Sequence, residues 1–441
     1  MNKLAMELND TLRDTVVADL LSDFGKRFYY PMGIPAQDAE AKKYAKTYNA
    51  TVGMAFANHE PIELAPVRAA MPGLTPFQSV AYAPTAGDPE LRTRWKEQIY
   101  RKNPDLAGAS ISEPVVVPGL TNGIAQAADL FVDPGDPVVI PDMFWENYSL
   151  VFEDRREAPL ATFPFFAEKA EAPAGGAPRW GLNLPGFRET LRSRARKGKV
   201  VLVVNFPNNP TGYSPTNAEA AALSALVAEL AEEGLKILVI VDDAYFGLFY
   251  EQDVYRQSLF ARLAQLHKNV LAIKIDGATK EDFVWGFRLG FVTFGGKGLT
   301  EAHYDALNKK LMGAIRSSIS NSSRPAQSLL LKALASPGYE TEKLRHFESL
   351  KERYLAVREI VSKRAAGRSL TTLPFNSGYF MSFRFEGGSA DALRRHLLME
   401  RGIGTVSLED RYLRVAYSSM ERDELEPLYD EIFKAADRLA R

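Results

Sequence analysis

The chain contains no cysteine among its 441 residues. Disulfide bonds, thiol nucleophiles and zinc sites with cysteine ligands are therefore excluded. Histidine is also scarce, and the sequence shows neither an H-E-x-x-H pattern nor a close pair. The five histidines are His59, His267, His303, His346 and His396. This scatter argues against a metal site built on clustered histidines.

Long hydrophobic runs and an excess of charge of one sign are missing as well. The longest apolar runs, such as residues 237–241, are far shorter than the about 20 residues needed to cross a bilayer. The 54 lysines and arginines nearly cancel the 55 aspartates and glutamates, so no basic surface for nucleic acid or a membrane is expected. Residues 1–21 mix charged and apolar side chains and predict an amphipathic helix rather than a signal peptide. We expect a cytoplasmic protein that acts on small molecules.

The apolar pattern of the middle third predicts an α/β fold. Short segments rich in valine and isoleucine occur at residues 115–117, 138–140, 200–204, 237–241 and 270–275. Segments that are apolar on both faces are typical of a parallel sheet covered by helices on each side. Residues 217–235 predict a helix that Gly234 ends. Strand, helix and strand in this order predict βαβ units and a large three-layer α/β/α domain with a mostly parallel sheet.

A smaller α+β domain is expected at the C-terminal end. Residues 167–178 are rich in alanine, proline and glycine and predict a surface loop. Beyond about residue 325 the pattern predicts a long charged helix, then strands, then a closing helix, at residues 340–366, 380–385, 405–408, 412–417 and 420–439. The predicted division is a large domain of residues 70–325 and a smaller part made of residues 1–69 and 326–441.

Polar side chains follow three of the predicted strands directly. The strand at 200–204 leads into residues 205–212 (NFPNNPTG), and the strand at 237–241 leads into residues 242–245 (DDAY). The strand at 270–275 leads into residues 276–280 (DGATK), with Arg288 eight residues beyond Lys280. Ligands of open parallel sheets bind beyond the carboxyl ends of the strands. We therefore expect an amide, a carboxylate with a phenol, and an amine with a guanidinium at one edge.

Each of these features also has an ordinary structural explanation. The NPTG segment could be a plain turn, and Asp242 could cap the next helix. Lys280 could be a solvated surface lysine, and Arg288 could pair with a nearby acid such as Asp282. The functional interpretation depends on their occurring together, in this order, on successive strand ends.

Together these motifs resemble those of the class I/II (fold type I) aminotransferases, which depend on pyridoxal 5′-phosphate (PLP). The motifs are the NPTG segment that begins at Asn209, Asp242-x-Ala-Tyr245, and Lys280 followed by Arg288 in a G-x-R-x-G frame. The resemblance extends from about Tyr82 to Arg414. It implies that PLP is the cofactor and that Lys280 carries it.

The resemblance also implies roles around the cofactor ring. Asp242 is expected to face the pyridine nitrogen and keep it protonated, so that the ring accepts electrons. Asn209 and Tyr245 match the pair that hydrogen-bonds the ring oxygen. Lys280 is expected to move the proton between substrate and cofactor carbons. Trp145 matches the aromatic side chain that stacks on the ring.

A further group of residues is implied at the cofactor phosphate. Arg288 is expected to clamp the phosphate as a fork, and a small-residue turn entering a helix offers N–H groups to it. The additional matches for this group are Gly119, Leu120, Thr121 and Thr279. The family often has a serine three residues before the lysine, where this chain has Gly277. Tyr82 resembles the tyrosine that reaches the phosphate of a second subunit, which implies a homodimer with shared active sites.

Substrate recognition is implied for two arginines. Arg414 resembles the residue that grips the substrate α-carboxylate through two hydrogen bonds, and Asn209 is expected to bind the substrate as well. Arg316 resembles the second arginine by which some aminotransferases read an acidic side chain, with Arg324 as a competing candidate. Gly53 is expected beside the substrate.

We therefore predict a PLP-dependent aminotransferase that moves an amino group between an L-amino acid and a 2-oxo acid. The resemblance implies glutamate and 2-oxoglutarate as one pair, with an acidic or aromatic amino acid as the other donor. A PLP-dependent β-lyase or decarboxylase of the same fold is the alternative reaction, because the ring contacts alone do not choose the bond that breaks. A non-catalytic PLP-binding regulator is the alternative of another class, although the balanced charge gives no DNA-binding surface.

Overall fold

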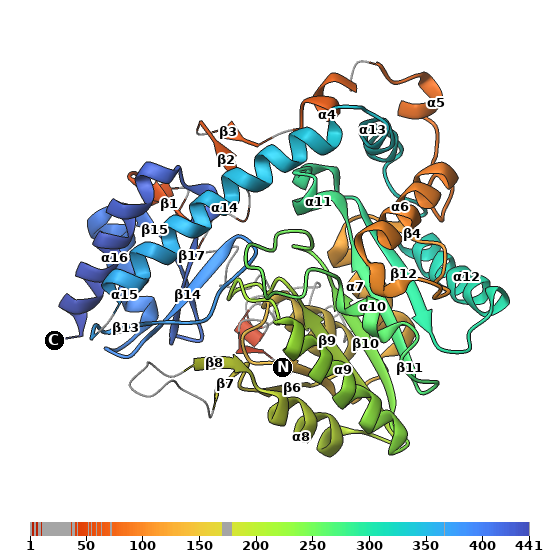
Figure 1. Cartoon of the computed structure of the whole chain (residues 1–441), viewed down its shortest axis with the longest axis horizontal. Helices are drawn as coiled ribbons and strands as arrows, with labels where there is room; N and C mark the ends of the chain where they lie inside the picture. The colour runs from red at the N-terminus through yellow and green to blue at the C-terminus, as the bar shows by residue number, and fades with distance from the viewer. Residues whose placement is uncertain are drawn as a thin grey trace.

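The computed structural model describes residues 2–3, 6–7, 10, 37, 40–41, 43–51, 53, 55–58, 60–62, 64–70, 73–169, 179–365 and 367–440. A central sheet has seven strands in the order β4-β12-β11-β10-β9-β5-β6 (Figure 1). They are β4 (Val115–Val117), β5 (Val138–Pro141), β6 (Leu160–Phe163), β9 (Lys199–Asn205), β10 (Lys236–Asp242), β11 (Val270–Asp276) and β12 (Gly290–Gly296). Strand β12 runs antiparallel to β4 and β11, while β11, β10, β9, β5 and β6 pair in parallel. The mostly parallel sheet is confirmed.

Helices cover both faces of this sheet. The pair α7 (Leu120–Phe131) and α12 (Glu301–Ser318) pack together on one side. The second group contains α8 (Leu184–Arg194), α9 (Asn217–Glu232) and α10 (Leu259–Leu263). Helix α9 begins where the sequence predicts, because Thr216 and Glu219 form a capping box. It ends three residues early, and Gly234 follows with a φ of +100°.

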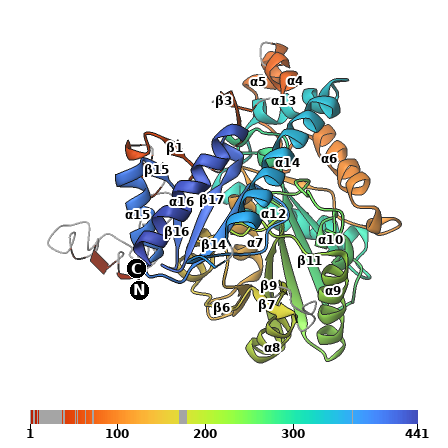
Figure 2. The same ribbon diagram turned by 60° about the vertical axis from the view of Figure 1, so that its left-hand side comes forward.

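A second sheet lies toward the C-terminal end of the chain. Its order is β13-β14-β17-β16, and all its pairs are antiparallel. The strands are β13 (Leu370–Thr372), β14 (Phe380–Phe385), β16 (Val406–Leu408) and β17 (Tyr412–Ala416). They accompany α14 (Tyr339–Arg364), α15 (Ala390–Arg401) and α16 (Leu425–Leu439), of which α14 and α16 pack side by side (Figures 1 and 2). The smaller α+β region is confirmed.

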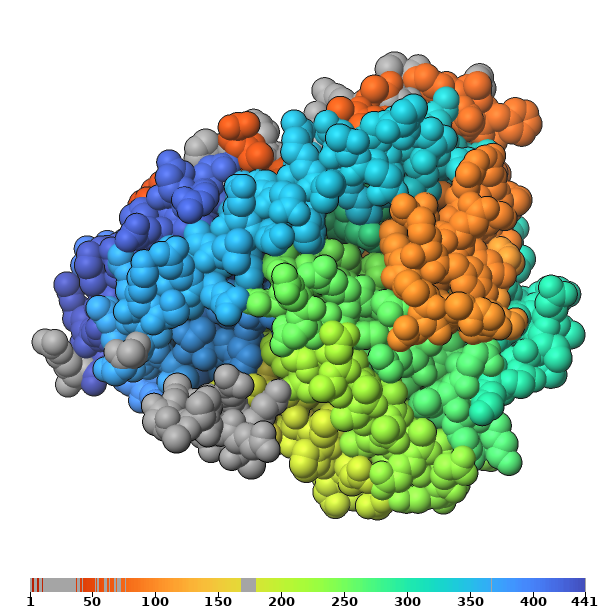
Figure 3. All heavy atoms as spheres, viewed as in Figure 1, coloured from red at the N-terminus to blue at the C-terminus, as the bar shows by residue number. Residues whose placement is uncertain are grey.

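The long helix α14 runs along the outside of the molecule. At one end it approaches α4 (Ala65–Ala70), and at the other it contacts α16. In the space-filling view its atoms form a continuous outer surface between the blue C-terminal elements and α6 (Pro89–Lys102) (Figure 3). The remaining short elements are β1 (Tyr48–Asn49), β2 (Phe56–Ala57), β3 (Glu60–Pro61), β15 (Ile403–Gly404), α5 (Pro76–Ser79), α11 (Ala278–Glu281) and α13 (Arg324–Leu334).

Some predicted boundaries differ from the structure. Residues 167–169 belong to β7 (Phe166–Lys169), which pairs with β8 (Arg179–Leu182), so that part of the predicted loop is wrong. Residues 170–178 lie outside the described residues, as does most of the helix predicted for residues 1–21. The closing helix starts at Leu425 instead of residue 420, because two short 3-10 turns precede it and Glu421 caps the second one.

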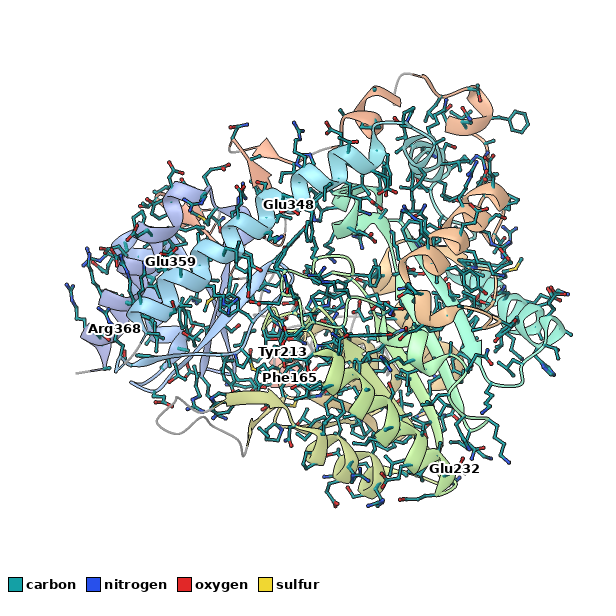
Figure 4. The ribbon with its side chains drawn as sticks, viewed as in Figure 1. Phe165, Tyr213, Glu232, Glu348, Glu359 and Arg368 are labelled. Atoms are coloured by element: carbon teal, nitrogen blue, oxygen red, sulfur yellow. The ribbon has the colours of Figure 1, made fainter. Side chains whose placement is uncertain are left out.

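The core extends from the central sheet to the turn that follows β9. Figure 4 shows Phe165 and Tyr213 close together near the centre of the molecule, with Glu232 and Glu348 at its periphery. The Phe165 and Tyr213 rings meet edge to face with centroids 6.2 Å apart. The hydroxyl group of Tyr213 donates to Glu219 at 2.6 Å. The turn before Tyr213 is therefore fixed by buried contacts. No helix among the described residues has the length and apolar character needed to cross a membrane.

Candidate active site

A cavity of about 390 Å³ lies at the carboxyl ends of the parallel strands. This size is within the usual range for a small-molecule site. Its lining residues are Thr51, Gly53, Leu120, Thr121, Trp145, Asn205, Asn209, Asp242, Ala244, Tyr245, Thr279, Lys280, Arg288, Phe380 and Arg414. Most of the residues singled out from the sequence thus meet around one space.

The strand register explains this convergence. Asp242 at the end of β10 is level with Asn205 on β9 and with Ile275 on β11. The three strands therefore end together, and the segments that follow them share one edge. Because β12 is antiparallel, its first residue, Gly290, lies at the same edge and pairs with Val117 of β4. The segment between β11 and β12 consequently brings both Lys280 and Arg288 to the cavity.

Asp242 is a buried carboxylate with neutral hydrogen-bond donors. The Tyr148 hydroxyl group donates to Oδ2 at 2.5 Å, and the Ala244 N–H group donates to Oδ1 at 3.0 Å. Burial raises the pKa of Asp242 above its ordinary value, while the Tyr148 hydrogen bond and the charge of Lys280 act in the opposite direction. The bond to Ala244 shows that Asp242 stabilises the local turn, while the residue also lines the cavity.

Lys280 is half-buried along the cavity wall and is not a freely solvated surface lysine. Its Nζ atom lies 4.9 Å from the centroid of the Tyr245 ring. Burial lowers the pKa of Lys280 to about 8, the Asp242 carboxylate opposes this shift and the Arg288 guanidinium adds to it. A lowered pKa increases the neutral fraction of the amine, and only a neutral amine condenses with an aldehyde.

The end of the cavity near α7 is shaped for an anion. Arg288 has a left-handed φ of +51°, and a Cβ atom added at Gly119 would lie 2.4 Å from its Nη2 atom. Gly119 itself has a φ of +87° and caps α7, whose first residues, Leu120 and Thr121, line the cavity. The Oγ1 atom of Thr279 is buried and has no hydrogen-bond partner among the described residues. A guanidinium, a helix N-terminus and an unused hydroxyl group therefore meet here.

The structure answers two points that the sequence raised in this region. Asp282 contacts Lys343 at 2.9 Å and accepts from Tyr339, so the suggested pairing with Arg288 is wrong. Gly277 replaces the serine typical of the family because no side chain fits there. A Cβ atom at this position would lie 2.6 Å from the Leu289 carbonyl oxygen.

Arg414 lines the cavity from the second sheet. It lies on β17 of the second sheet and is 2% exposed. Its Nη1 atom donates to Asn209 Oδ1 and its Nη2 atom donates to the Thr51 carbonyl oxygen, both at 3.0 Å. The guanidinium carbon lies 4.2 Å from the centroid of the Phe380 ring. A buried cation thus lines the same cavity as Lys280.

Three candidates lie outside this cavity. Tyr82 is 91% exposed, and Arg316 is an exposed side chain of α12. Arg324, the other candidate for reading an acidic side chain, forms an ion pair with Asp88 at 2.6 Å. The cavity of a single chain is therefore formed without Tyr82, Arg316 and Arg324.

Several residues in the cavity wall or directly behind it were not anticipated from the sequence. Tyr148 bonds Asp242, Asn205 Nδ2 donates to the Asp242 carbonyl oxygen at 2.9 Å, and Thr51 and Phe380 surround Arg414. Two of them carried a usable signal. Tyr148 lies three residues after Trp145, and Asn205 is the last residue of β9.

The donor set fits PLP. The anion-binding end suits a phosphate, Asp242 suits a protonated ring nitrogen, and Lys280 suits an aldehyde. Residues 63–432 match the family described as aminotransferase class I and II.

The chain belongs to this family. It is therefore a PLP-dependent transaminase of fold type I.

Individual relatives of this aminotransferase are distant. It is 25% identical over 369 residues to the aspartate/prephenate aminotransferase of Thermus thermophilus, covering 82% of each chain. It is 25% identical over 359 residues to an aspartate aminotransferase of Pyrococcus horikoshii, covering 79% of this chain and 81% of the relative. Among solved structures, an aminotransferase from Anaerococcus prevotii superposes with a TM-score of 0.80 at 22% identity, covering 94% of this chain and 98% of the other. At that identity the superposition shows the fold alone.

Proposed function

We propose that this aminotransferase moves an amino group between an L-amino acid and a 2-oxo acid, with glutamate and 2-oxoglutarate as one pair. An acidic or aromatic amino acid is the other donor. The main support is that Lys280 and Arg414 line the same cavity. An amino acid held by its carboxylate at Arg414 would present its α-carbon toward Lys280. The names of the relatives, aspartate/prephenate and aspartate aminotransferase, are consistent with such donors.

The proposal assigns the cofactor contacts to residues of this chain. Lys280 would carry PLP, Asp242 would face the ring nitrogen, Asn209 and Tyr245 would hydrogen-bond the ring oxygen, and Trp145 would stack on the ring. Gly119, Leu120, Thr121, Thr279 and Arg288 would hold the phosphate. When bound, PLP supplies a pyridinium ring that accepts electrons from the substrate. The buried, hydrogen-bonded carboxylate of Asp242 supports that role, because it can hold a proton on the ring nitrogen.

Proton transfer is assigned to the amine of Lys280. Its Nζ atom would accept the proton from the substrate α-carbon and donate it again to complete the transfer. A pKa of about 8 for Lys280 suits this exchange. An amine whose pKa lies near physiological pH can both accept and donate a proton.

The substrate α-carboxylate is assigned to Arg414. Its guanidinium is already oriented by Asn209 and Thr51, so little side-chain freedom is lost on binding. Gly53 and Asn209 lie beside the same space, and a side chain at position 53 would approach Phe380 within 3.6 Å.

We also propose a homodimer with shared active sites in the cytoplasm. Tyr82 and Arg316 are exposed and lie outside the cavity of their own chain, so they can serve a site only across a subunit interface. Arg316 would then read an acidic side chain and Tyr82 would reach the phosphate. Within each chain, residues 70–325 form the large domain, and residues 1–69 with 326–441 form the smaller part.

A panel of amino acids in single-turnover reactions tests the proposed function. The absorbance of bound PLP should change stoichiometrically with the donor, and the matching 2-oxo acid should appear. Faster conversion of aspartate and glutamate would support Arg316, whereas preference for phenylalanine or tyrosine would exclude that role. Release of ammonia with pyruvate would replace the aminotransferase proposal by a β-lyase, and loss of carbon dioxide would replace it by a decarboxylase.

A further inference from the structure

A second group of buried ionisable side chains lies at the ends of β10 and β11 and does not line the cavity. Lys274 on β11 is 1% exposed, and its Nζ atom contacts the carboxylate of Asp243 and, at 3.2 Å, that of Asp276. Lys274 and Asp276 are two residues apart on one strand and therefore share a face of the sheet. Ile275 between them points to the other face, toward α7. We call Lys274, Asp243 and Asp276 the rear cluster.

The rear cluster is fully enclosed by specific contacts. The Ser258 hydroxyl group donates to Asp243 at 2.5 Å, and the Trp95 Nε1–H group donates to Asp276 at 3.1 Å. The Phe246 ring lies 4.7 Å from the Lys274 Nζ atom. Burial alone would lower the pKa of Lys274, but the two carboxylates outweigh it and the net shift is upward. Lys274 is therefore a charged ammonium shared by two buried acids.

Each acid of the rear cluster is joined directly to a cofactor-site residue. Asp243 follows Asp242, and the Asp243 N–H group donates to the Ile275 carbonyl oxygen at 2.9 Å. Asp276 is the last residue of β11, and the short helix α11, which contains Lys280, begins two residues later. The Lys274 ammonium thus connects the end of β10, which carries Asp242, to the end of β11, which leads to Lys280.

We propose that Lys274 is a positioning residue for the cofactor site, fixing Asp242 and Lys280 relative to each other from behind the sheet. This inference rests on the roles proposed above for Asp242 and Lys280. Lys274 acts by geometry, because it ties two strand ends, and by charge, because a nearby cation favours the ionised form of Asp242. A purely structural role is the competing explanation. Buried ion pairs are weak evidence for stability, since well-packed apolar side chains often replace them without loss.

Two variants of the PLP-loaded chain separate these explanations. Lys274→Met leaves two buried acids without their counter-ion. It should lower kcat about 10- to 100-fold and change the KM for the amino acid by less than about threefold. The combined variant K274M/D243N/D276N leaves no charge in the rear cluster. It should unfold near the wild-type temperature yet keep a kcat at least about tenfold below that of the wild type.

Two readouts do not depend on turnover. The Kd for PLP should rise in both variants, and the pH at which the absorbance of bound PLP changes should shift. Arg353→Met is the matched control. Arg353 is 3% exposed and pairs with Glu421 at 3.2 Å, outside the cavity. It should lower the unfolding temperature and leave kcat, the Kd for PLP and the absorbance unchanged.

The proposal is overturned if the uncharged combined variant matches the wild type in kcat, PLP affinity and absorbance, even when K274M alone fails to fold. It is also overturned if K274M changes only the unfolding temperature, as R353M should. Asp242→Asn in the same assays distinguishes this failure from that of the proposed function. A normal D242N enzyme, or a wild type that forms no 2-oxo acid, would contradict the proposed function whatever K274M does.

Discussion

Asp242 and Asp243 are neighbours in the chain, are 3% and 2% exposed, and yet have opposite surroundings. Asp242 receives neutral donors from Tyr148 and Ala244, and no cation lies within 4 Å of it among the described residues. Asp243 contacts the ammonium of Lys274 and the hydroxyl group of Ser258. Burial raises the pKa of both, that of Asp243 to about 6. Two adjacent acids at one strand end can therefore differ in role: Asp242 lines the cavity, whereas Asp243 is paired with a buried lysine.

The largest expected effect lies on the cavity side. Lys280→Ala should reduce the transamination rate by about 10⁴-fold, because it removes both the cofactor-carrying amine and the proton-transfer group. Turnover and the absorbance of PLP mixed with the variant would measure this loss. A variant with the wild-type rate would contradict the assignment of the cofactor to Lys280.

Neutralising Asp242 should lower kcat more than neutralising Asp243. Asp242→Asn should lower kcat about 10²- to 10³-fold, because the ring nitrogen loses its anionic partner. Asp243→Asn should lower kcat less than about tenfold, since Lys274 keeps Asp276 as a counter-ion. Steady-state kinetics of the two variants side by side provide the test. Equal losses would remove the distinction between the two acids.

Replacing Arg414 should weaken mainly the binding of the substrate. Arg414→Lys replaces a planar two-pronged donor by a point charge and should lose about 1.5–3 kcal/mol of binding to the α-carboxylate. The expected result is a kcat/KM roughly 10- to 100-fold lower for every amino acid tested. A loss confined to one type of side chain would show that Arg414 reads the side chain instead.

The rate of PLP binding should depend on pH through the ionisation of the Lys280 amine. Because the pKa of Lys280 is lowered to about 8, the reactive neutral form increases as the pH rises and is dominant above that value. The rate at which the cofactor-free chain binds PLP should rise with a midpoint near pH 8 and then level off. A midpoint near the ordinary lysine value would mean that the cavity does not shift Lys280.

The smallest expected effect concerns the phosphate end. Thr279→Ala removes a buried hydroxyl group that has no partner among the described residues and should weaken PLP binding roughly 3- to 10-fold. Equilibrium titration with PLP measures this change. An unchanged Kd would show that Thr279 does not contact the phosphate.

Much of the site was predictable because it follows consecutive strands. Apolar runs located β9, β10 and β11, and the polar residues after them had to meet at one edge. The contact between Tyr148 and Asp242 could not be inferred, since it joins residues 94 positions apart through side-chain direction. The α16 start was missed because residues 422–424 form a 3-10 turn directly before the helix.

The roles proposed for Tyr82 and Arg316 are harder to place from one sequence. Both side chains are exposed in the single chain, and no pattern along it specifies which surface a second copy would cover. Gly277 could be noted as unusual, but the reason, a close approach of the Leu289 carbonyl oxygen, requires the packed structure.

The connection between β11 and β12 has fixed anchor points at both ends. Asp276 is level with Phe291 across the antiparallel pair, and Gly290 is level with Val117. Any insertion or deletion within residues 277–289 would have to be absorbed between these anchors, because the paired strands cannot slide without turning their side chains to the wrong face. The spacing from Lys280 to Arg288 should therefore tolerate substitutions far better than changes in length, which makes this segment a poor place for loop grafting.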